Sequence, residues 1–159
     1  MGYVAPDMTT PAAVYRIARL GAGDDAMATA LFETMAAVFE EEDRPLGAAY
    51  LARLLVREET WILVATLGDA VIGGLTAHTL PMTRSETREI FIYDIAVRAE
   101  HQRRGVGRLL MSQLTRLAGD AGIHDLFVPA DNEDTHALDF YRALGGAPLP
   151  VTFFTFSPR

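Results

Sequence analysis

The sequence contains no cysteine, and this absence excludes several kinds of chemistry together. It leaves no disulfide, no thiolate metal ligand and no cysteine nucleophile. It also fits a reducing compartment, so the expected location is the cytoplasm. No apolar run reaches the roughly 18 residues that a membrane-spanning helix needs. Residues 1–11 lack the basic start and apolar core of a signal peptide, so no membrane partner is expected.

Metal-binding patterns and excess positive charge are also missing. The 4 histidines show no HxxxH-type spacing, so the prediction is that the chain holds no metal site. The net charge is -7 and the pI is near 5.0, whereas a general nucleic-acid binder is usually basic. The expected partners therefore include no nucleic acid. An acidic surface instead attracts cations.

The chain does contain a regular succession of strand-like and helix-like segments. At 159 residues, half of them apolar, it is expected to form a single domain over 1–159, with residues 1–13 as a loose N-terminal tail. The apolar periodicities predict the order β α α β β β α β α β. This order is typical of an α/β (α+β) fold with a mixed, mostly antiparallel sheet flanked by helices. The expected strands cover 14–20, 61–67, 70–80, 89–97, 125–129 and 151–156, and the expected helices cover 25–39, 47–57, 108–119 and 135–144.

A basic, glycine-containing turn stands between the strand expected at 89–97 and the helix that follows it. Its sequence is Gln102-Arg103-Arg104-Gly105-Val106-Gly107, and Arg98 and Arg108 flank it. Glycines let backbone N–H groups approach an anion closely, and a helix N-terminus adds N–H donors and a partial positive charge. The turn therefore predicts a phosphate-binding site. The sequence lacks the Gly-Lys-Ser/Thr of a Walker loop and the GxGxxG of a dinucleotide fold.

Over about 15–156 the chain resembles the GNAT superfamily of N-acetyltransferases in its order of elements. The turn at 102–107 is similar to the family's Gln/Arg-x-x-Gly-x-Gly/Ala signature, and 137–145 is similar to its Ala-x-x-x-Tyr-x-x-x-Gly motif. The resemblance implies acetyl-coenzyme A (acetyl-CoA) as cosubstrate, with its pyrophosphate on the turn and its pantetheine arm beside the strand end at 95–97. Two positions depart from the family pattern, because Asp134 replaces a frequent Asn and Gly146 replaces a frequent Phe. The coenzyme-binding residues that the resemblance implies are Ile95, Ala96, Val97, Gln102, Arg103, Arg104, Gly105, Val106, Gly107, Arg108, Asp134, Ala137 and Tyr141.

Several segments are similar to the aminoglycoside 3-N-acetyltransferase branch of this superfamily. They are 50–55, 70–75, 79–81, 89–97 and 128–141. This narrower resemblance implies that the acetyl acceptor is a cationic small molecule, namely an aminoglycoside antibiotic acetylated at its 3-amino group, as in resistance. A homodimer is also an expectation from the family. The aromatic segment at 153–156 would supply its contact surface or simply core.

Asp94 is the first candidate catalytic residue, because it is a carboxylate inside an apolar strand. Burying a carboxylate is costly unless the group is paired or functional, and burial raises its pKa. An amine must lose a proton before it attacks, and a nearby carboxylate can take that proton directly or through water. Glu89, at the start of the same strand, is the second candidate. The family resemblance makes Tyr141 the candidate general acid, which protonates or hydrogen-bonds the departing coenzyme thiolate.

Acidic residues form two groups that would attract a polycation. One group lies in the expected loop between the first two helices, and the other follows the strand expected at 125–129. Each group is also compatible with ordinary solvated loop charge. His78 lies on a strand that ends toward the expected acceptor side, where it is a base, a contact to sugar hydroxyls or a structural residue. The candidate substrate-binding residues are Glu40, Glu41, Glu42, Asp43, His78, Asp94, Asp131 and Asp134.

Direct attack within a ternary complex is the expected mechanism, because a thioester is already an activated acyl donor and needs no covalent nucleophile. Two alternatives remain open. In the first, the acceptor is another amine, such as a polyamine or a peptide N-terminus. In the second, the chain is a coenzyme A-binding sensor without turnover, which the presence of Asp94 and Tyr141 argues against.

Overall fold

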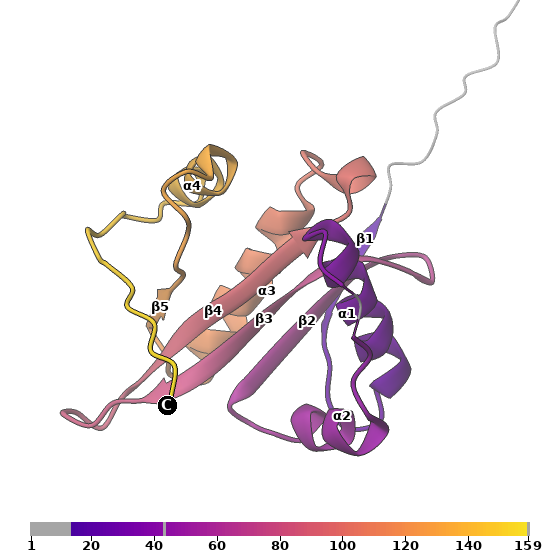
Figure 1. The fold of residues 1–159 in the computed structure, drawn as a ribbon, viewed down its shortest axis with the longest axis horizontal. Helices are drawn as coiled ribbons and strands as arrows, with labels where there is room; N and C mark the ends of the chain where they lie inside the picture. The colour runs from indigo at the N-terminus through magenta and orange to yellow at the C-terminus, as the bar shows by residue number, and fades with distance from the viewer. Residues whose placement is uncertain (1–13, 43, 159) are drawn as a thin grey trace, which may run out of the picture. The chain divides into compact units, whose positions relative to one another are not determined.

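The computed structural model describes residues 14–42 and 44–158 (Figure 1). The tail expected at 1–13 and the candidate residue Asp43 lie outside the described residues. The chain divides into two compact units, residues 1–128 and 129–159. The first unit holds the whole sheet and most of the helices, whereas the second holds one helix and the C-terminal segment.

A five-stranded sheet forms the centre of the first unit, with the strand order β1-β2-β3-β4-β5. Neighbouring strands from β1 to β4 are antiparallel, and β5 is parallel to β4. The sheet is therefore mixed and mostly antiparallel, which confirms the predicted fold class. The strands are β1 (Tyr15–Arg19), β2 (Thr60–Leu67), β3 (Ala70–Pro81), β4 (Arg88–Val97) and β5 (Asp125–Phe127).

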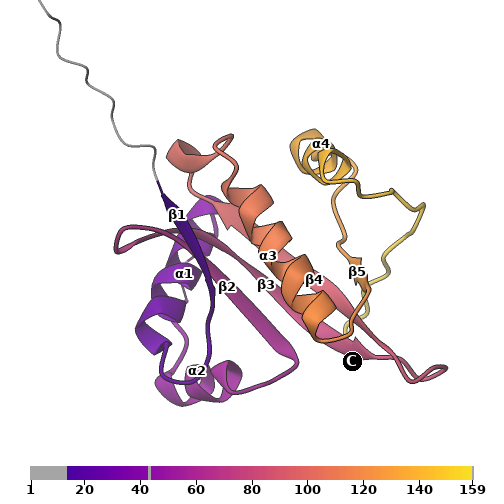
Figure 2. The same cartoon turned by 180° about the vertical axis from the view of Figure 1, so that it is seen from behind.

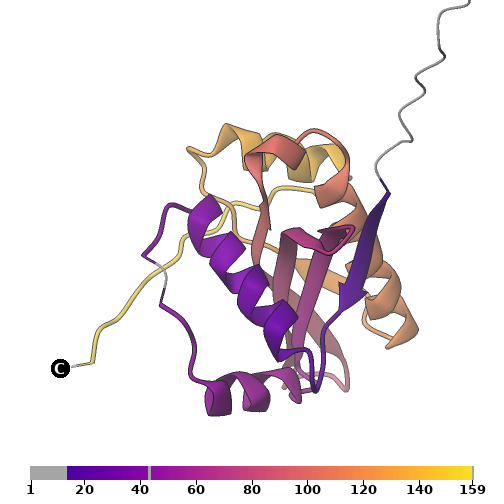
Figure 3. The same ribbon diagram turned by 90° about the vertical axis from the view of Figure 1, so that its right-hand side faces the viewer.

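Helices cover both faces of this sheet, so the first unit has three layers (Figure 3). The helices α1 (Asp25–Val38) and α2 (Ala48–Leu55) cover one face. The other face, toward the viewer in Figure 2, is crossed by α3 (Val106–Asp120), which follows the short 3-10 helix η1 (Ala99–His101). Each face buries its own apolar cluster, one shared by α3 with the sheet and one shared by α1 and α2 with the sheet. The helix faces with apolar periodicity are thus the faces that pack on the sheet.

A β-bulge in β4 changes the face of the sheet on which its later residues lie. Thr76 of β3 pairs with Asp94, whereas the next residue of β3 pairs with Ile92, so Tyr93 is the extra residue. Before the bulge, Ile92 belongs to the cluster on the α3 side, and after it Ala96 belongs to the cluster on the α1 side. Because side chains alternate between faces, the bulge places Asp94 on the α1 side of the sheet instead of the α3 side.

The second unit contains α4 (Thr135–Ala143), which lies where the sequence predicts a helix. The strand predicted at 151–156 is not formed, and Phe153, Phe154 and Phe156 in it are 67%, 77% and 90% exposed. A strand needs a neighbour for its backbone N–H and C=O groups, and no described strand pairs with this segment. This is the one expected element that the structure does not contain among its described residues.

Candidate active site

The carboxylate of Asp94 is half-buried on β4 and lies opposite Thr76 of β3. The Thr76 hydroxyl donates a hydrogen bond of 3.4 Å from Oγ1 to Oδ2 of Asp94. Burial is the main influence on the pKa of Asp94 and raises it, whereas this hydrogen bond lowers it. Repulsion from Glu41 raises the same pKa further, and attraction to His78 lowers it. A carboxylate with a raised pKa is a stronger proton acceptor, as removal of a proton from an amine requires.

Glu89 lies on the same face of β4 as Asp94, but it is the second residue of the strand whereas Asp94 is the seventh. It pairs with Leu80 of β3 on one side and with Asp125 of β5 on the other. The rise along a strand separates positions 89 and 94 by roughly 15 Å. The two carboxylates therefore do not form a pair that shares a proton, and Glu89 stays a separate candidate.

The turn that is predicted to hold phosphate joins β4 to α3 through η1, and its backbone has two left-handed residues. Gly105 has a φ of 85° directly before the first residue of α3, and Arg103 has a φ of 60°. Glycine adopts this conformation at little cost, which suits it to the start of the helix. The side-chain amide of Gln102 donates a hydrogen bond of 2.9 Å to the Val97 carbonyl and so ties the turn to the end of β4. The turn leads into the first N–H groups of α3, which have no acceptor within the helix.

The arginines around this turn divide into two groups. Arg103, Arg104 and Arg108 are exposed on the turn and on the first residues of α3. Arg98 is instead directed toward α1, where its guanidinium donates a hydrogen bond of 3.2 Å to Oγ1 of Thr34. Three of the four arginines are therefore exposed beside the turn, and the fourth is directed toward α1.

Beyond Phe91, the β5 side of β4 is an open edge. Within the described part of the chain, β5 pairs with β4 only at positions 89–91, while β3 stays paired with β4 up to Val97. Backbone groups at 95–97 that point toward the β5 side are thus available to an extended ligand. Val106, at the start of α3, is only 1% exposed, so it can offer a ligand its backbone alone.

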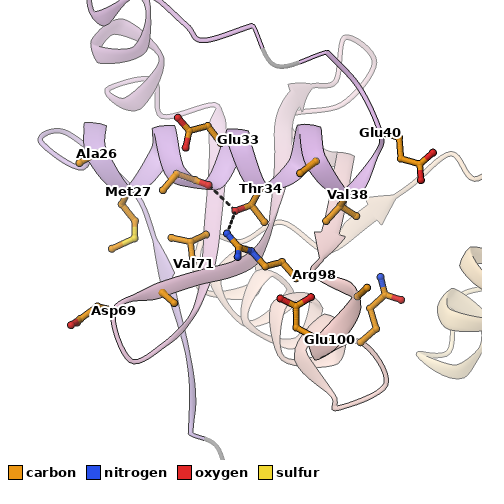
Figure 4. Close-up of a pocket in the computed structure, with 15 residues that line it drawn as sticks. Ala26, Met27, Glu33, Thr34, Val38, Glu40, Asp69, Val71, Arg98 and Glu100 are labelled. Carbon is orange, nitrogen blue, oxygen red and sulfur yellow. Dashed lines mark hydrogen bonds between the residues drawn. The ribbon is translucent and has the colours of Figure 1, made fainter.

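A groove of about 830 Å³ lies between α1, the turn from β2 to β3, and the segment at 98–102 (Figure 4). Arg98 lines it with the hydrogen bond to Thr34 described above, and the carboxylates of Glu40 and Glu100 lie around it. Gln102 is also part of its wall, so the groove adjoins the turn at 102–107. Asp94 does not line it. The groove is therefore a neighbour of the turn and not the place where Asp94 would accept a proton.

The acidic run after α1 does not act as one patch. Glu40 has a φ of 56° and lines the groove. Glu42 accepts hydrogen bonds of 2.9 and 3.2 Å from Arg44, which neutralises part of its charge. Glu41 is the one that acts on the pKa of Asp94. Of the three described residues in this run, the structure thus connects Glu41 to the candidate base.

The acidic candidates of the second unit make local hydrogen bonds to backbone. Oδ1 of Asp131 accepts a hydrogen bond of 2.9 Å from the N–H of Glu133. Oδ1 of Asp134 accepts one of 2.9 Å from the N–H of Ala137 and thereby caps the N-terminus of α4. Asp134 is therefore the N-cap residue of α4. Each carboxylate keeps lone pairs that a cation can use.

Two of the candidate residues are rings with aromatic neighbours. His78, half-buried on β3, stands edge-to-face to Tyr93 with 6.0 Å between ring centroids. It lies on the same sheet face as Asp94, because both are in register with residues of that face. Tyr141, half-buried on α4, contacts the ring of Phe140 with 5.1 Å between centroids.

Thr76 and Tyr93 are residues of this face that sequence reasoning missed. The hairpin turn at 68–69 indicates how β2 and β3 pair, but the register of β3 on β4 also depends on the bulge. Residues 89–97 look like one uniform apolar strand, so no local signal in the sequence reveals the extra residue. A hydroxyl-bearing Thr within an apolar strand is a weak signal for position 76, because Thr79 in the same strand has it too.

None of the helices in the described ranges has the length and apolarity that crossing a bilayer requires. The same ranges contain no group of three or more His, Cys, Asp or Glu side chains that could hold a metal ion.

The acetyltransferase (GNAT) family model matches residues 25–145, which is more than half of the chain. The chain belongs to this family. GNAT proteins use acetyl-CoA, and the matched range includes β4, the turn at 102–107 and α4.

Two solved aminoglycoside acetyltransferases from uncultured soil metagenomic samples are similar to this GNAT protein. One, meta-AAC0020, in complex with trehalose, is 32% identical with a TM-score of 0.86, and the match covers 91% of this chain and 97% of that one. The same protein in complex with sisomicin is 31% identical over the same shares. The other, HMB0005, is 31% identical with a TM-score of 0.86 and covers 92% and 99% of the two chains. The GNAT protein thus resembles the aminoglycoside branch of its family.

A relative from Mycobacterium leprae (strain TN), the uncharacterized protein ML0378, is 35% identical over 111 residues. The match covers 67% of this GNAT protein and 28% of ML0378, so the chain spans little more than a quarter of that relative's length.

Proposed function

We propose that this GNAT protein transfers the acetyl group of acetyl-CoA to an amino group of a cationic small molecule, most specifically the 3-amino group of an aminoglycoside. The observation that carries the proposal is the position of Asp94. This carboxylate has a raised pKa and lies in the stretch of β4 that β5 leaves unpaired. A thioester bound along the open edge and an amine held at the carboxylate would therefore meet at one point of β4.

The coenzyme would lie along the end of β4 and on the phosphate turn. Gly105 and Gly107 let backbone N–H groups approach the pyrophosphate, and the exposed arginines at 103, 104 and 108 would neutralise its charge. Gln102 would position the turn through its hydrogen bond to Val97. The edge at 95–97 would pair with the amide groups of the pantetheine arm. Asp134, Ala137 and Tyr141 are assigned to the coenzyme by family resemblance.

The proposed reaction transfers the acetyl group directly from the thioester sulfur to the nitrogen of the acceptor. An ammonium group of the acceptor gives one proton to Asp94, directly or through water, and becomes a neutral amine. Its nitrogen attacks the thioester carbonyl carbon, which backbone N–H groups of β4 polarise. The carbon–sulfur bond then breaks and the attacking nitrogen loses its second proton to water, which yields the neutral N-acetyl product and coenzyme A thiolate. Asp94 returns the first proton to solvent before the next turnover. Tyr141 is the proposed donor of a proton or hydrogen bond to that thiolate.

Charge and similarity both support an aminoglycoside as the acceptor. Glu41 and Asp94 place two carboxylates near each other, and such groups attract a polycation. His78 lies on the same face as Asp94. The further acidic candidates are Glu40, Glu42, Asp43, Asp131 and Asp134. The similar protein meta-AAC0020 has been solved with sisomicin, and 31% identity over 91% of this chain makes the same substrate class the first to test.

A thiol-release assay with acetyl-CoA tests this function. We expect coenzyme A release with gentamicin, sisomicin or apramycin, and loss of that release in Asp94→Asn. NMR spectroscopy of the product should place the acetyl group on the 3-amino nitrogen. Release with spermidine alone would favour a polyamine acetyltransferase. Tight coenzyme binding without release from any acceptor would favour the sensor and contradict the enzyme.

A homodimer is part of the proposal, because the C-terminal segment exposes a dense set of apolar side chains. Leu149, Val151, Phe153, Phe154 and Phe156 are each between 67% and 90% exposed. Contiguous exposed apolar residues of this kind mark interaction surfaces, and a second copy of the chain would bury them. Light scattering after size-exclusion chromatography should show a dimer for the wild type. It should show a monomer when the three phenylalanines are replaced by Ser, and a monomeric wild type would contradict the proposal.

A further inference from the structure

Four aromatic rings form a continuous row across β3, β4 and β5. Ring centroids lie 6.0 Å apart for His78 and Tyr93, 5.7 Å for Phe91 and Tyr93, and 5.3 Å for Phe91 and Phe127. Strand register supports the same arrangement, because Phe91 pairs with His78 on one side and with Phe127 on the other. The row therefore follows from the pairing of three strands and does not depend on one side-chain rotamer.

The row is on the sheet face that carries Asp94, and it lies outside both apolar clusters. Ile90 and Ile92 point to the α3 side, so Phe91 between them points to the α1 side. Tyr93 contacts Phe91 and is 62% exposed, and Phe127 is 41% exposed. Rings that contact one another on an accessible face beside a carboxylate are typical of a ligand-binding surface.

The β-bulge in β4 determines the positions of both the candidate base, Asp94, and the most exposed ring of this face, Tyr93. Tyr93 is the extra residue of the β-bulge, and Asp94 is its neighbour in the chain. The bulge brings Asp94 to the face on which Tyr93 meets His78 and Phe91. An acceptor held at the carboxylate of Asp94 would therefore have the ring of Tyr93 directly beside it.

We propose that His78, Phe91, Tyr93 and Phe127 form an aromatic floor on which a ring of the acceptor lies. The inference rests on the proposed function and adds a rule of selection, namely that cyclic amino sugars are preferred over linear polyamines. The negative faces of aromatic rings attract ammonium groups and the C–H bonds beside them. One face of a sugar or cyclitol ring can contact several of these aromatic rings, whereas a linear polyamine has a smaller contact area on them. The nearby Asp94 and Glu41 carboxylates complement the positive charge of such a ligand.

Replacement of the exposed ring by an aliphatic side chain tests the floor. Tyr93→Leu should raise KM for sisomicin by about 3- to 30-fold, the range that one cation–π contact provides. KM for acetyl-CoA should stay unchanged. Tyr93→Phe, which keeps the ring, should behave like the wild type, and Phe127→Leu should repeat the effect at a second ring. The matched control is Tyr50→Leu on α2, because Tyr50 is 52% exposed and lies outside the row.

Calorimetric titration of sisomicin separates this inference from the proposed function, with thermal unfolding to confirm that each variant is folded. If the wild type binds sisomicin without acetylating it and Tyr93→Leu weakens that binding, the aromatic binding surface is supported and the proposed catalysis is contradicted. If the wild type acetylates sisomicin while Tyr93→Leu and Phe127→Leu leave KM and affinity unchanged, the floor is overturned and the function stands. A Tyr93→Phe variant as weak as Tyr93→Leu overturns the floor, because the hydroxyl would then be responsible. A wild type that neither binds nor acetylates any aminoglycoside overturns both.

Discussion

Asp94 stands between neighbours that move its pKa in opposite directions. Burial and Glu41 raise the pKa, whereas the Thr76 hydrogen bond and His78 lower it. These neighbours come from β3 and from the segment after α1, so the proton affinity of one carboxylate depends on several elements. Such a balance suits a base that must be ionised before the reaction and still accept a proton from an ammonium group.

Two substitutions should move the acidic limb of the pH dependence of kcat/KM in opposite directions. Thr76→Val removes a hydrogen bond that lowers the pKa of Asp94, so the limb should move to higher pH. Glu41→Gln removes a charge that raises this pKa, so the limb should move to lower pH. Thiol release across a pH series measures both, with Glu86→Gln in the exposed loop before β4 as control. Shifts in the same direction would exclude Asp94 as the titrating base.

Asp94→Asn should lower kcat/KM by about 100- to 10,000-fold, the usual contribution of a general base. The same change should slightly stabilise the fold at neutral pH. The raised pKa means that the folded protein binds the proton of Asp94 more tightly than the unfolded chain does. Ionised Asp94 therefore costs stability once the pH passes from the unfolded to the folded pKa, and costs nothing below both. The Tm advantage of Asp94→Asn should thus be present at neutral pH and absent in acid, and a lower Tm at neutral pH would contradict this.

At the scale of elements, local patterns predicted where the helices and most strands lie. They did not predict the backbone irregularity that decides on which face of the sheet a side chain lies. The helices, the hairpin at 68–69 and the turn at 102–107 were predictable, because each depends on residues close in sequence. The bulge at Tyr93 was not, yet it decides the face on which Asp94 lies. For 151–156 the local pattern predicted a strand that is absent, because no described strand pairs with this segment. In the acidic run, the pairing of Glu42 with Arg44 separates residues that look equivalent in the sequence.

Close packing of α1 on β3 can be tested with two glycines. A Cβ at Gly74 would lie 2.4 Å from Cδ1 of Leu31 and 2.4 Å from the carbonyl oxygen of Leu63. Gly74→Ala should therefore destabilise the fold by about 1–3 kcal/mol. Gly119→Ala, in α3 with nothing within 4 Å of its added Cβ, should instead stabilise it by about 0.5–1 kcal/mol. Urea unfolding measures both, and equal changes in the free energy of unfolding would contradict the close approach of α1.

At the scale of the whole molecule, the chain is poor in groups that acetyl-CoA could modify. It has neither cysteine nor lysine, because all 14 of its basic residues are arginine. A guanidinium stays protonated and is not a nucleophile at neutral pH. Apart from the α-amino group, the protein's own acyl acceptors are thus hydroxyls and imidazoles, which need activation before they react.

Acetyl-CoA alone should therefore leave the intact mass of the protein unchanged, and added sisomicin should release coenzyme A without a burst phase. Both follow from direct attack, since no acetyl-enzyme forms. Rapid-quench mass spectrometry measures the first and stopped-flow thiol detection measures the second. An acetyl adduct that persists after sisomicin is added would lie on the α-amino group and off the reaction path. An adduct that forms with acetyl-CoA and disappears with sisomicin would lie on a hydroxyl or imidazole of the site, because the chain has no lysine or cysteine. Such an adduct would contradict direct attack and indicate a covalent mechanism.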